Sequence, residues 1–129
     1  MPASLKGTPP MTPTPSRYYT IEKLPKASVI ELHLDPTLDI QAFNEITEQL
    51  IDRWPIERGR DVIVDLSTSH FHGSVLLGLI INIRTRARAG GGELIVVAAS
   101  PGLMQVCRTA NLDRLIVMVP TRAQALARL

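Results

Sequence analysis

The sequence predicts an α/β fold, a mixed and mostly parallel sheet of about five strands with about four helices. From residue 62 onward, short β-branched runs alternate with longer segments of helical periodicity, which is typical of parallel strands joined by crossover helices. Before them, two alternating segments at 18–24 and 28–34 indicate an antiparallel hairpin, because Pro25-Lys26-Ala27 supplies a turn. The 129 residues, 45% of them hydrophobic, suit one domain with a substantial core.

The first helix is predicted between two prolines. Asp35-Pro36-Thr37 ends the second strand, and Asp39 can cap the helix that follows. Apolar residues recur there at spacings of three and four, at Phe43, Ile46, Leu50 and Trp54. Pro55 is expected to stop the helix.

The second half of the chain supplies the other elements. The β-branched run at 62–66 predicts a strand covered on both faces. A helix is expected at 74–89, a strand at 94–98, and a helix opened by Ser100-Pro101. In this last helix four residues are expected to face inward, namely Leu103, Val106, Cys107 and Ala110. A strand from Leu115 to Val119 and a helix at 123–129, capped by Thr121, complete the prediction.

Residues 1–16 differ in composition from the rest of the chain. They contain half of the ten prolines and almost no charged or bulky apolar groups. Such a segment cannot bury enough surface to offset its ordering entropy. We therefore expect a flexible tail at 1–16 and a single domain at 17–129.

Composition argues against several classes of function. The formal charge is only +2 and aromatic residues make up 4%, whereas a dedicated nucleic-acid binder usually shows a denser basic patch and more stacking aromatics. No apolar run reaches membrane-spanning length, and the first residues do not resemble a secretory signal. Cys107 has no internal disulfide partner, which is compatible with a reducing cytoplasm.

The strongest functional signal lies where the strand at 62–66 passes through a polar loop into the helix that begins at Ser74. A hydroxyl at a helix start lies among backbone N–H groups without helical partners, at the positive end of the helix dipole. This position favours a phosphate group. Asp65, at the end of the strand, is expected to hydrogen-bond the N–H groups of the loop, although it could instead position a water molecule or a metal ion. We expect no catalytic residues.

Two other patterns favour structural interpretations. Glycines 90–92 lie between a helix and a strand, so they predict a helix stop rather than a phosphate-binding loop. His33, His70 and His72 could bind zinc only if the strand ends met, and no cysteine or acidic cluster completes such a site. We expect exposed loop histidines, no metal, and Cys107 in a packing role.

The helix at 74–89 is too apolar for one buried face. One stripe contains Leu76, Leu79 or Ile80, Ile83 and Ala87, and we expect it to face the sheet. A second stripe runs from Leu77 and Ile81 to Arg84 and Arg88. A neighbouring helix could cover it, but we expect at least partial exposure beside Ser74, as a surface for a partner.

In order and spacing, these elements resemble the STAS domain, the fold of bacterial anti-sigma factor antagonists. The matching segments are VIVDLS (62–67), FHGS (71–74), RARAGG (86–91), LIVV (94–97), Ser100-Pro101, NLDRL (111–115) and TRAQAL (121–126). The resemblance covers about residues 18–129 and is more specific in the later half.

The resemblance implies a regulatory protein rather than an enzyme. In that family a kinase-type anti-sigma factor phosphorylates a hydroxyl in a turn that typically reads Asp-Ser-Ser/Thr-Gly, and the unphosphorylated antagonist captures the kinase. Here Gly73, Ser74, Val75 and Leu76 occupy those four positions, so Ser74 is the phosphoacceptor that the resemblance implies.

The expected partner-binding residues are Asp65, Ser67, His72, Gly73, Ser74, Leu77, Ile81 and Arg84. The expected partner is a kinase-type anti-sigma factor or another regulatory protein, with a phosphatase as a further partner, in the cytoplasm and without a cofactor, nucleic acid or membrane. Two alternatives stay open: a phosphorylation-independent scaffold, and a small-ligand sensor with a pocket beside Asp65.

Overall fold

The computed structural model describes residues 18–53, 59–69 and 74–129, with only the backbone described at 51–53 and at Ser74. Residues 1–16, expected to form the tail, lie outside this part of the chain. So do Trp54 and Pro55, expected at the end of the first helix, and the loop residues His70, His72 and Gly73.

The described residues form one five-stranded sheet in the order β2-β3-β4-β5-β6. The strands are β2 (Tyr19–Lys23), β3 (Ala27–Leu32), β4 (Asp61–Asp65), β5 (Leu94–Val97) and β6 (Val117–Val119). β2 pairs antiparallel with β3, and the remaining neighbours pair in parallel. The predicted hairpin and the mixed, mostly parallel sheet are therefore confirmed.

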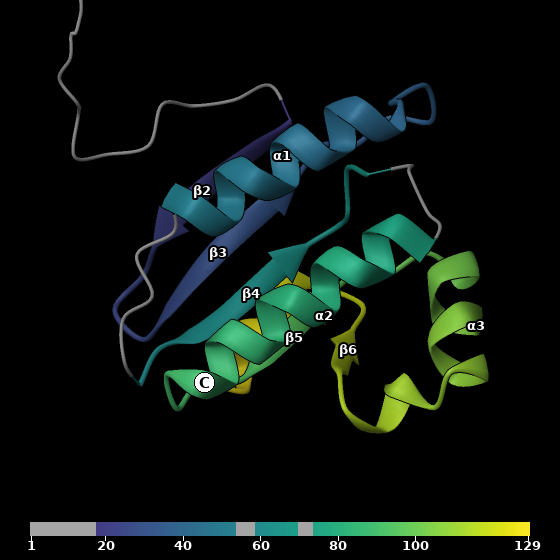
Figure 1. Ribbon diagram of the computed structural model, residues 1–129. Helices are drawn as coiled ribbons and strands as arrows, with labels where there is room; N and C mark the ends of the chain where they lie inside the picture. The colour runs from purple at the N-terminus through teal and green to yellow at the C-terminus, as the bar shows by residue number, and fades with distance from the viewer. Residues whose placement is uncertain (1–17, 54–58, 70–73) are drawn as a thin grey trace, which may run out of the picture.

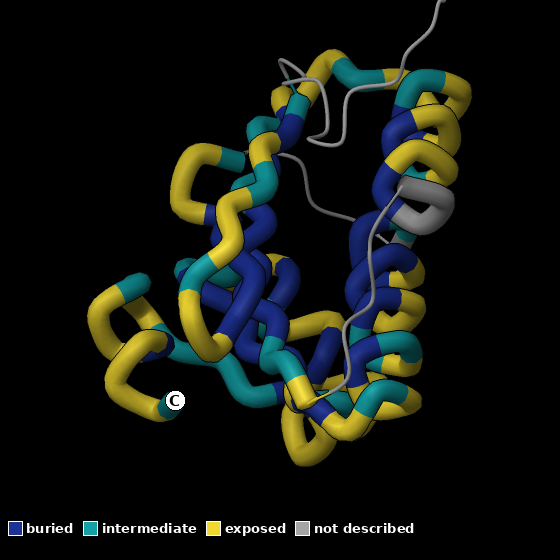
Figure 2. Tube along the Cα trace, turned by 90° about the vertical axis from the view of Figure 1, so that its left-hand side faces the viewer, coloured by how far each residue is buried: buried dark blue, intermediate teal, exposed yellow. Residues whose placement is uncertain are grey.

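The helices lie on both faces of this sheet. α1 (Ile40–Arg53) and α2 (Ser74–Ala89) run side by side over one face, α3 (Pro101–Thr109) lies beyond its edge, and α4 (Arg122–Ala127) lies on the opposite face (Figure 1). Figure 2, turned by 90°, separates the layer formed by α1 and α2 from α4 at the chain end. A single-turn 3-10 helix, η1 (Leu112–Arg114), joins α3 to β6.

The central strands β3, β4 and β5 divide their side chains between two cores because successive residues point to opposite faces. Under α1 and α2, Ile30, Val64 and Val96 join the predicted helix residues Phe43, Ile46, Leu50, Leu76, Ile80 and Ile83 in the larger cluster. On the other face, Val29, Ile63 and Val97 pack with Ala125 of α4. Both faces of the central strands are therefore covered, as their β-branched sequences predict.

The helix boundaries follow local hydrogen-bonding signals. Asp39 accepts a hydrogen bond from the Ala42 N–H at 2.7 Å, and Ser100 and Thr121 cap α3 and α4 in the same way. At the end of α2, Gly91 has a φ of 89° and the Gly92 N–H reaches the Ala87 carbonyl at 2.9 Å. This left-handed stop confirms that glycines 90–92 end a helix.

Two predictions about the last third of the chain are wrong. Leu115 does not begin a strand, because η1 occupies 112–114 and β6 starts only at Val117. In α3, Leu103 and Cys107 are buried, but Val106 and Ala110 are exposed. The reason is that α3 packs beside the first turns of α2, beyond the sheet edge, where only a narrow stripe of a helix is covered.

Candidate functional site

Asp65 lies at the carboxyl end of β4 and holds the start of the loop toward α2. Its side chain is buried, with the residue only 3% exposed. One carboxylate oxygen, Oδ1, accepts hydrogen bonds from the Ser67 N–H at 2.9 Å and from the Ser67 hydroxyl at 2.6 Å. This confirms the interpretation that Asp65 bonds the loop backbone.

The next two loop residues are attached to the end of β3. The Ser69 hydroxyl donates to the Leu32 carbonyl at 2.7 Å and accepts from the Leu34 N–H at 3.0 Å. The Thr68 hydroxyl lies 2.7 Å from His33 Nδ1. Residues 67–69 are thus fixed to two neighbouring strands, and Ser67 and Thr68 are exposed.

The other carboxylate oxygen of Asp65 is bound by Arg122, from the first turn of α4. Arg122 Nε and Nη2 lie 3.0 and 2.9 Å from Asp65 Oδ2. Burial alone would raise the pKa of Asp65, but the hydrogen bonds from Ser67 and Arg122, with the charge of Arg122, outweigh it. The pKa of Asp65 therefore lies below its ordinary value, and the carboxylate is ionised at neutral pH.

Arg122 also contacts two further carboxylates on the neighbouring strands. Its guanidinium lies 3.6 Å from Glu31 on β3 and 3.5 Å from Glu22 on β2. His33 Nε2 lies 3.5 Å from the other oxygen of Glu31. Arg122 therefore links α4 to three adjacent strands. The sequence does not predict this role of Arg122, because nothing local indicates that a residue following the Thr121 cap contacts a strand end 57 positions earlier.

The sequence predicts no metal site among the histidines of the chain. In the part of the chain that the structure describes, no three His, Cys, Asp or Glu side chains come together as a metal site would require. His33 is engaged by Thr68 and Glu31. His70 and His72 lie outside that part of the chain.

The first stripe of α2 faces the sheet as expected, with Leu76, Ile80 and Ile83 buried. The second stripe differs from expectation at its start. Leu77 is only 9% exposed and belongs to the core, so the expectation that it is exposed is wrong. α2 packs against both α1 and α3, so both stripes are covered near its first turn. Ile81, one turn later, is 38% exposed, as expected.

Arg84 continues the exposed part of this stripe. Its Nε donates a hydrogen bond to the Leu115 carbonyl at 2.9 Å, which joins α2 to the segment after η1. Leu115 is itself 50% exposed. Ile81, Arg84 and Leu115 therefore form an apolar surface with one cation, which we call the α2 surface. Arg88, at the far end of the stripe, pairs with Glu93 at 2.7 Å.

Ser74 is the first residue of α2, as the sequence predicts, so the loop from β4 enters the helix at this position. The backbone N–H groups of a first helical turn have no helical partners and can receive an anion. Asp65, Ser67 and the start of α2 thus follow one another along a single connection at the carboxyl edge of the sheet.

Cys107, by contrast, has a structural environment. It is buried on the inner face of α3. Burial, with the nearby negative charge of Asp113, raises the pKa of the Cys107 thiol. A buried thiol with a raised pKa is a weak nucleophile, so the packing role expected for Cys107 is confirmed.

Comparison with known proteins identifies the family to which this fold belongs. The family model described as the STAS domain matches residues 18–125. The chain therefore belongs to the STAS domain family.

Solved structures with the same fold agree. An anti-sigma-factor antagonist (STAS) domain protein from Planctomyces limnophilus has 18% identity and a TM-score of 0.72, covering 85% of this chain and 96% of that one. The anti-sigma factor antagonist SpoIIAA in its unphosphorylated form has 22% identity and a TM-score of 0.65, covering 85% and 94%. A chain of the stressosome, a signal integration and transduction hub, has 20% identity and a TM-score of 0.62, covering 85% and 100%. At these identities the likeness concerns the fold.

Across residues 18–53, 59–69 and 74–129, no helix combines the length and the apolar character needed to cross a membrane.

Proposed function

We propose that this chain is an anti-sigma factor antagonist, or a similar component of a partner-switching phosphorylation pathway, with Ser74 as its phosphoacceptor. In this role the unphosphorylated domain binds a kinase-type anti-sigma factor in the cytoplasm. The kinase modifies Ser74, and a phosphatase restores the binding form. The chain acts as a substrate and a binding partner, without catalysis or a cofactor of its own.

The observation that carries this proposal is the position of Ser74. It begins α2 directly beyond the loop whose start is held by Asp65. A phosphate there would carry about −1.5 to −2 charges at neutral pH. It would gain hydrogen bonds from N–H groups of the helix start. It would also displace or repel a partner seated on the same loop.

The partner surface that we propose combines this loop with the α2 surface. The loop contributes Asp65, Ser67, His72, Gly73 and Ser74, and the α2 surface contributes Ile81 and Arg84, with Leu115 as an addition from the structure. Exposed Ile81 and Leu115 beside Arg84 suit a protein interface, because arginine combines charge, stacking and forked hydrogen bonding. Leu77, being buried, would support this surface from below rather than contact the partner.

A phosphotransfer experiment tests the proposal. The full chain is incubated with ATP and kinase-type anti-sigma factors, and the modified residue is located by mass spectrometry. We expect phosphate on Ser74 and none on a Ser74→Ala variant. The matched control is Ser100→Ala, because Ser100 also stands at a helix start and caps α3 by accepting from the Leu103 N–H at 3.2 Å. Labelling that persists in Ser74→Ala would contradict the assignment and direct the search to Ser67, Thr68 and Ser69.

A second function, a phosphorylation-independent scaffold, is favoured by the residue after Ser74. Val75 stands where the resemblance places a second hydroxyl, and it packs against the larger core. Only one hydroxyl therefore remains in this turn. A scaffold would form the same complexes with and without ATP, as measured by light scattering coupled to size-exclusion chromatography, whereas a switch component would lose its complex after phosphorylation.

A further inference from the structure

A cavity of about 490 Å³ lies between α3 and β6. It is lined by residues 98–101, Met104 and residues 118–120. These segments lie at the carboxyl ends of β5 and β6 and in the first turns of α3. In open α/β sheets, ligands bind in crevices at this edge of the strands. The volume also falls within the range of small-molecule sites.

The chemistry of the lining selects the class of ligand. Among the described residues, the lining side chains are alanine, proline, valine and methionine, with Ser100 as the one hydroxyl. That hydroxyl already accepts the Leu103 N–H of α3. Among the described residues that line the cavity there is no charged side chain, so a phosphate, a nucleotide or a carboxylate would find no counter-charge. An uncharged aliphatic group matches this lining.

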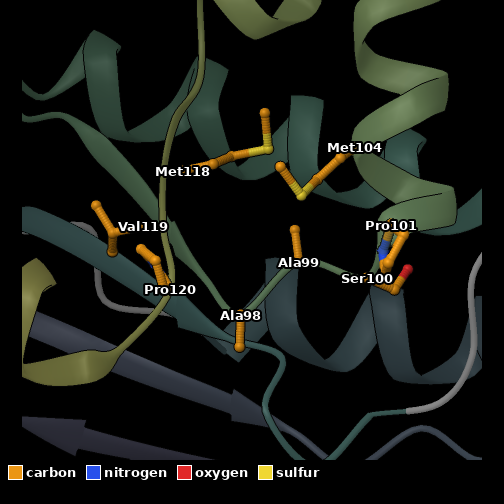
Figure 3. A pocket seen from close by; sticks show the side chains of 8 residues that line it. All are labelled: Ala98, Ala99, Ser100, Pro101, Met104, Met118, Val119 and Pro120. Carbon is orange, nitrogen blue, oxygen red and sulfur yellow. The ribbon is translucent and has the colours of Figure 1, made fainter.

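The methionines make the cavity adaptable. Figure 3 shows the side chains of Met104 and Met118 pointing toward each other across the opening, with Ala99 pointing into the space beside them. Both methionines are only half-buried. Unbranched thioether side chains rearrange readily around apolar ligands of different shape. The two side chains can therefore adjust to apolar ligands of different shape.

The backbone beside the cavity is strained. Ala98 has a φ of 59°, in the left-handed region that a residue with a Cβ rarely adopts. Its N–H donates to the Val119 carbonyl at 2.9 Å, which holds the turn against the end of β6. Strained residues held by their surroundings concentrate at ligand sites. Ala98 and Val119, the two residues joined at this turn, both line the cavity.

From these observations we infer that the cavity is a binding site for an uncharged small molecule with an aliphatic chain, whose chain lies between Met104 and Met118 and whose polar end stays in solvent. This inference is independent of the proposed phosphorylation of Ser74.

The test uses the full chain labelled with 13C at the methionine methyl groups, with the signals of Met104 and Met118 assigned through methionine-to-leucine variants. The probe is 1-octanol. The matched probe is 1,8-octanediol, which carries a hydroxyl at both ends and would have to bury one of them without a partner. We expect saturable shifts of both methionine signals with 1-octanol and at least tenfold weaker binding of the diol.

Two variants locate the site. Ala99→Leu fills the cavity and should weaken 1-octanol binding at least tenfold. The same change at Ala89, an exposed residue in the last turn of α2, should leave binding unchanged. If Ala99→Leu does not fold, nuclear Overhauser effects between the octanol chain and both methionine methyl groups of the unaltered chain decide the matter. Their presence supports the site.

Three results would overturn the inference. The first is the absence of saturable shifts or of these Overhauser effects, and the second is equal affinity in the Ala99→Leu variant. The third is a shift of the same two signals when the protein concentration rises without octanol, because a second copy of the chain would then occupy the cavity.

Discussion

Arg122 and Asp65 stand 57 residues apart, and two nitrogens of the arginine contact a single carboxylate oxygen of the aspartate at 2.9 and 3.0 Å. The other oxygen of Asp65 holds Ser67. One buried carboxylate thus connects the C-terminal helix to the loop that leads to Ser74. The pair thereby holds the start of the loop from α4, which lies on the face of the sheet opposite α2.

Removing Arg122 should therefore destabilise the domain. Arg122→Ala leaves the buried Asp65 without its cation, and we expect a loss of about 1–3 kcal/mol in the free energy of unfolding, measured by urea denaturation. Arg122 is partly exposed, which keeps the loss below that of a fully buried pair. The matched control is Arg88→Ala, which breaks the exposed pair with Glu93 and should cost at most about 1 kcal/mol. Equal losses in the two variants would show that the Asp65 pair has no special role.

The lowered pKa of Asp65 predicts that the stability of the domain depends on pH in the acid range. The pKa of Asp65 in the folded chain lies below its ordinary value of 3.8, so folding favours the ionised form. Its contribution is complete above about pH 5 and is lost as the pH falls through the lowered pKa. The difference in unfolding free energy between the unaltered chain and Asp65→Asn should thus shrink below pH 4, as measured by denaturation at a series of pH values. A difference that stays constant down to pH 2 would contradict this expectation.

Alanine substitutions at Leu77 and Ile81 should have different effects, the first on stability and the second on partner binding. Leu77 is buried in the core, so Leu77→Ala should cost about 2–5 kcal/mol. Ile81→Ala should change stability by only about 0.5 kcal/mol and should weaken capture of an anti-sigma factor, as should Arg84→Ala. Thermal melting and binding titrations of the three variants check this. Full binding by both Ile81→Ala and Arg84→Ala would remove the α2 surface from the proposed interface.

The proposed domain boundary can be tested by truncation. We expect a chain that starts at Arg17 to unfold cooperatively, with the same thermal midpoint as the full chain, because residues 1–16 carry few groups that could join a core. Calorimetry of the two chains makes the comparison. A lower or broader transition in the shorter chain would place part of the 1–16 segment in the folded domain.

What the sequence could predict depended on whether the signal was local. The sequence predicts the helix at 74–89 with its observed bounds and Asp39 and Thr121 as caps, because capping joins residues three positions apart. The contact between Arg122 and Asp65 requires the sheet order and the placement of α4 on the second face. Periodicity alone indicates neither the sheet order nor the position of α4.

The errors have the same origin. Residue spacing does not show whether the second apolar stripe of α2 is covered. The burial of Leu77 depends on the neighbouring helices α1 and α3. Leu115 was placed in a strand because it precedes a β-branched run, whereas η1 places it on the surface beside Arg84. For a single apolar residue next to a strand sequence, periodicity does not distinguish the first residue of the strand from an exposed residue before it.

The central claim is that phosphorylation of Ser74 switches partner binding, and one titration tests it most directly. The affinity of a kinase-type anti-sigma factor is measured by isothermal titration calorimetry with one preparation of the full chain, before and after phosphorylation at Ser74 is complete by mass spectrometry. We predict that the unmodified chain binds and that phosphate on Ser74 weakens binding at least tenfold, which is about 1.4 kcal/mol. An unchanged affinity, or binding by the phosphorylated chain alone, would contradict the account.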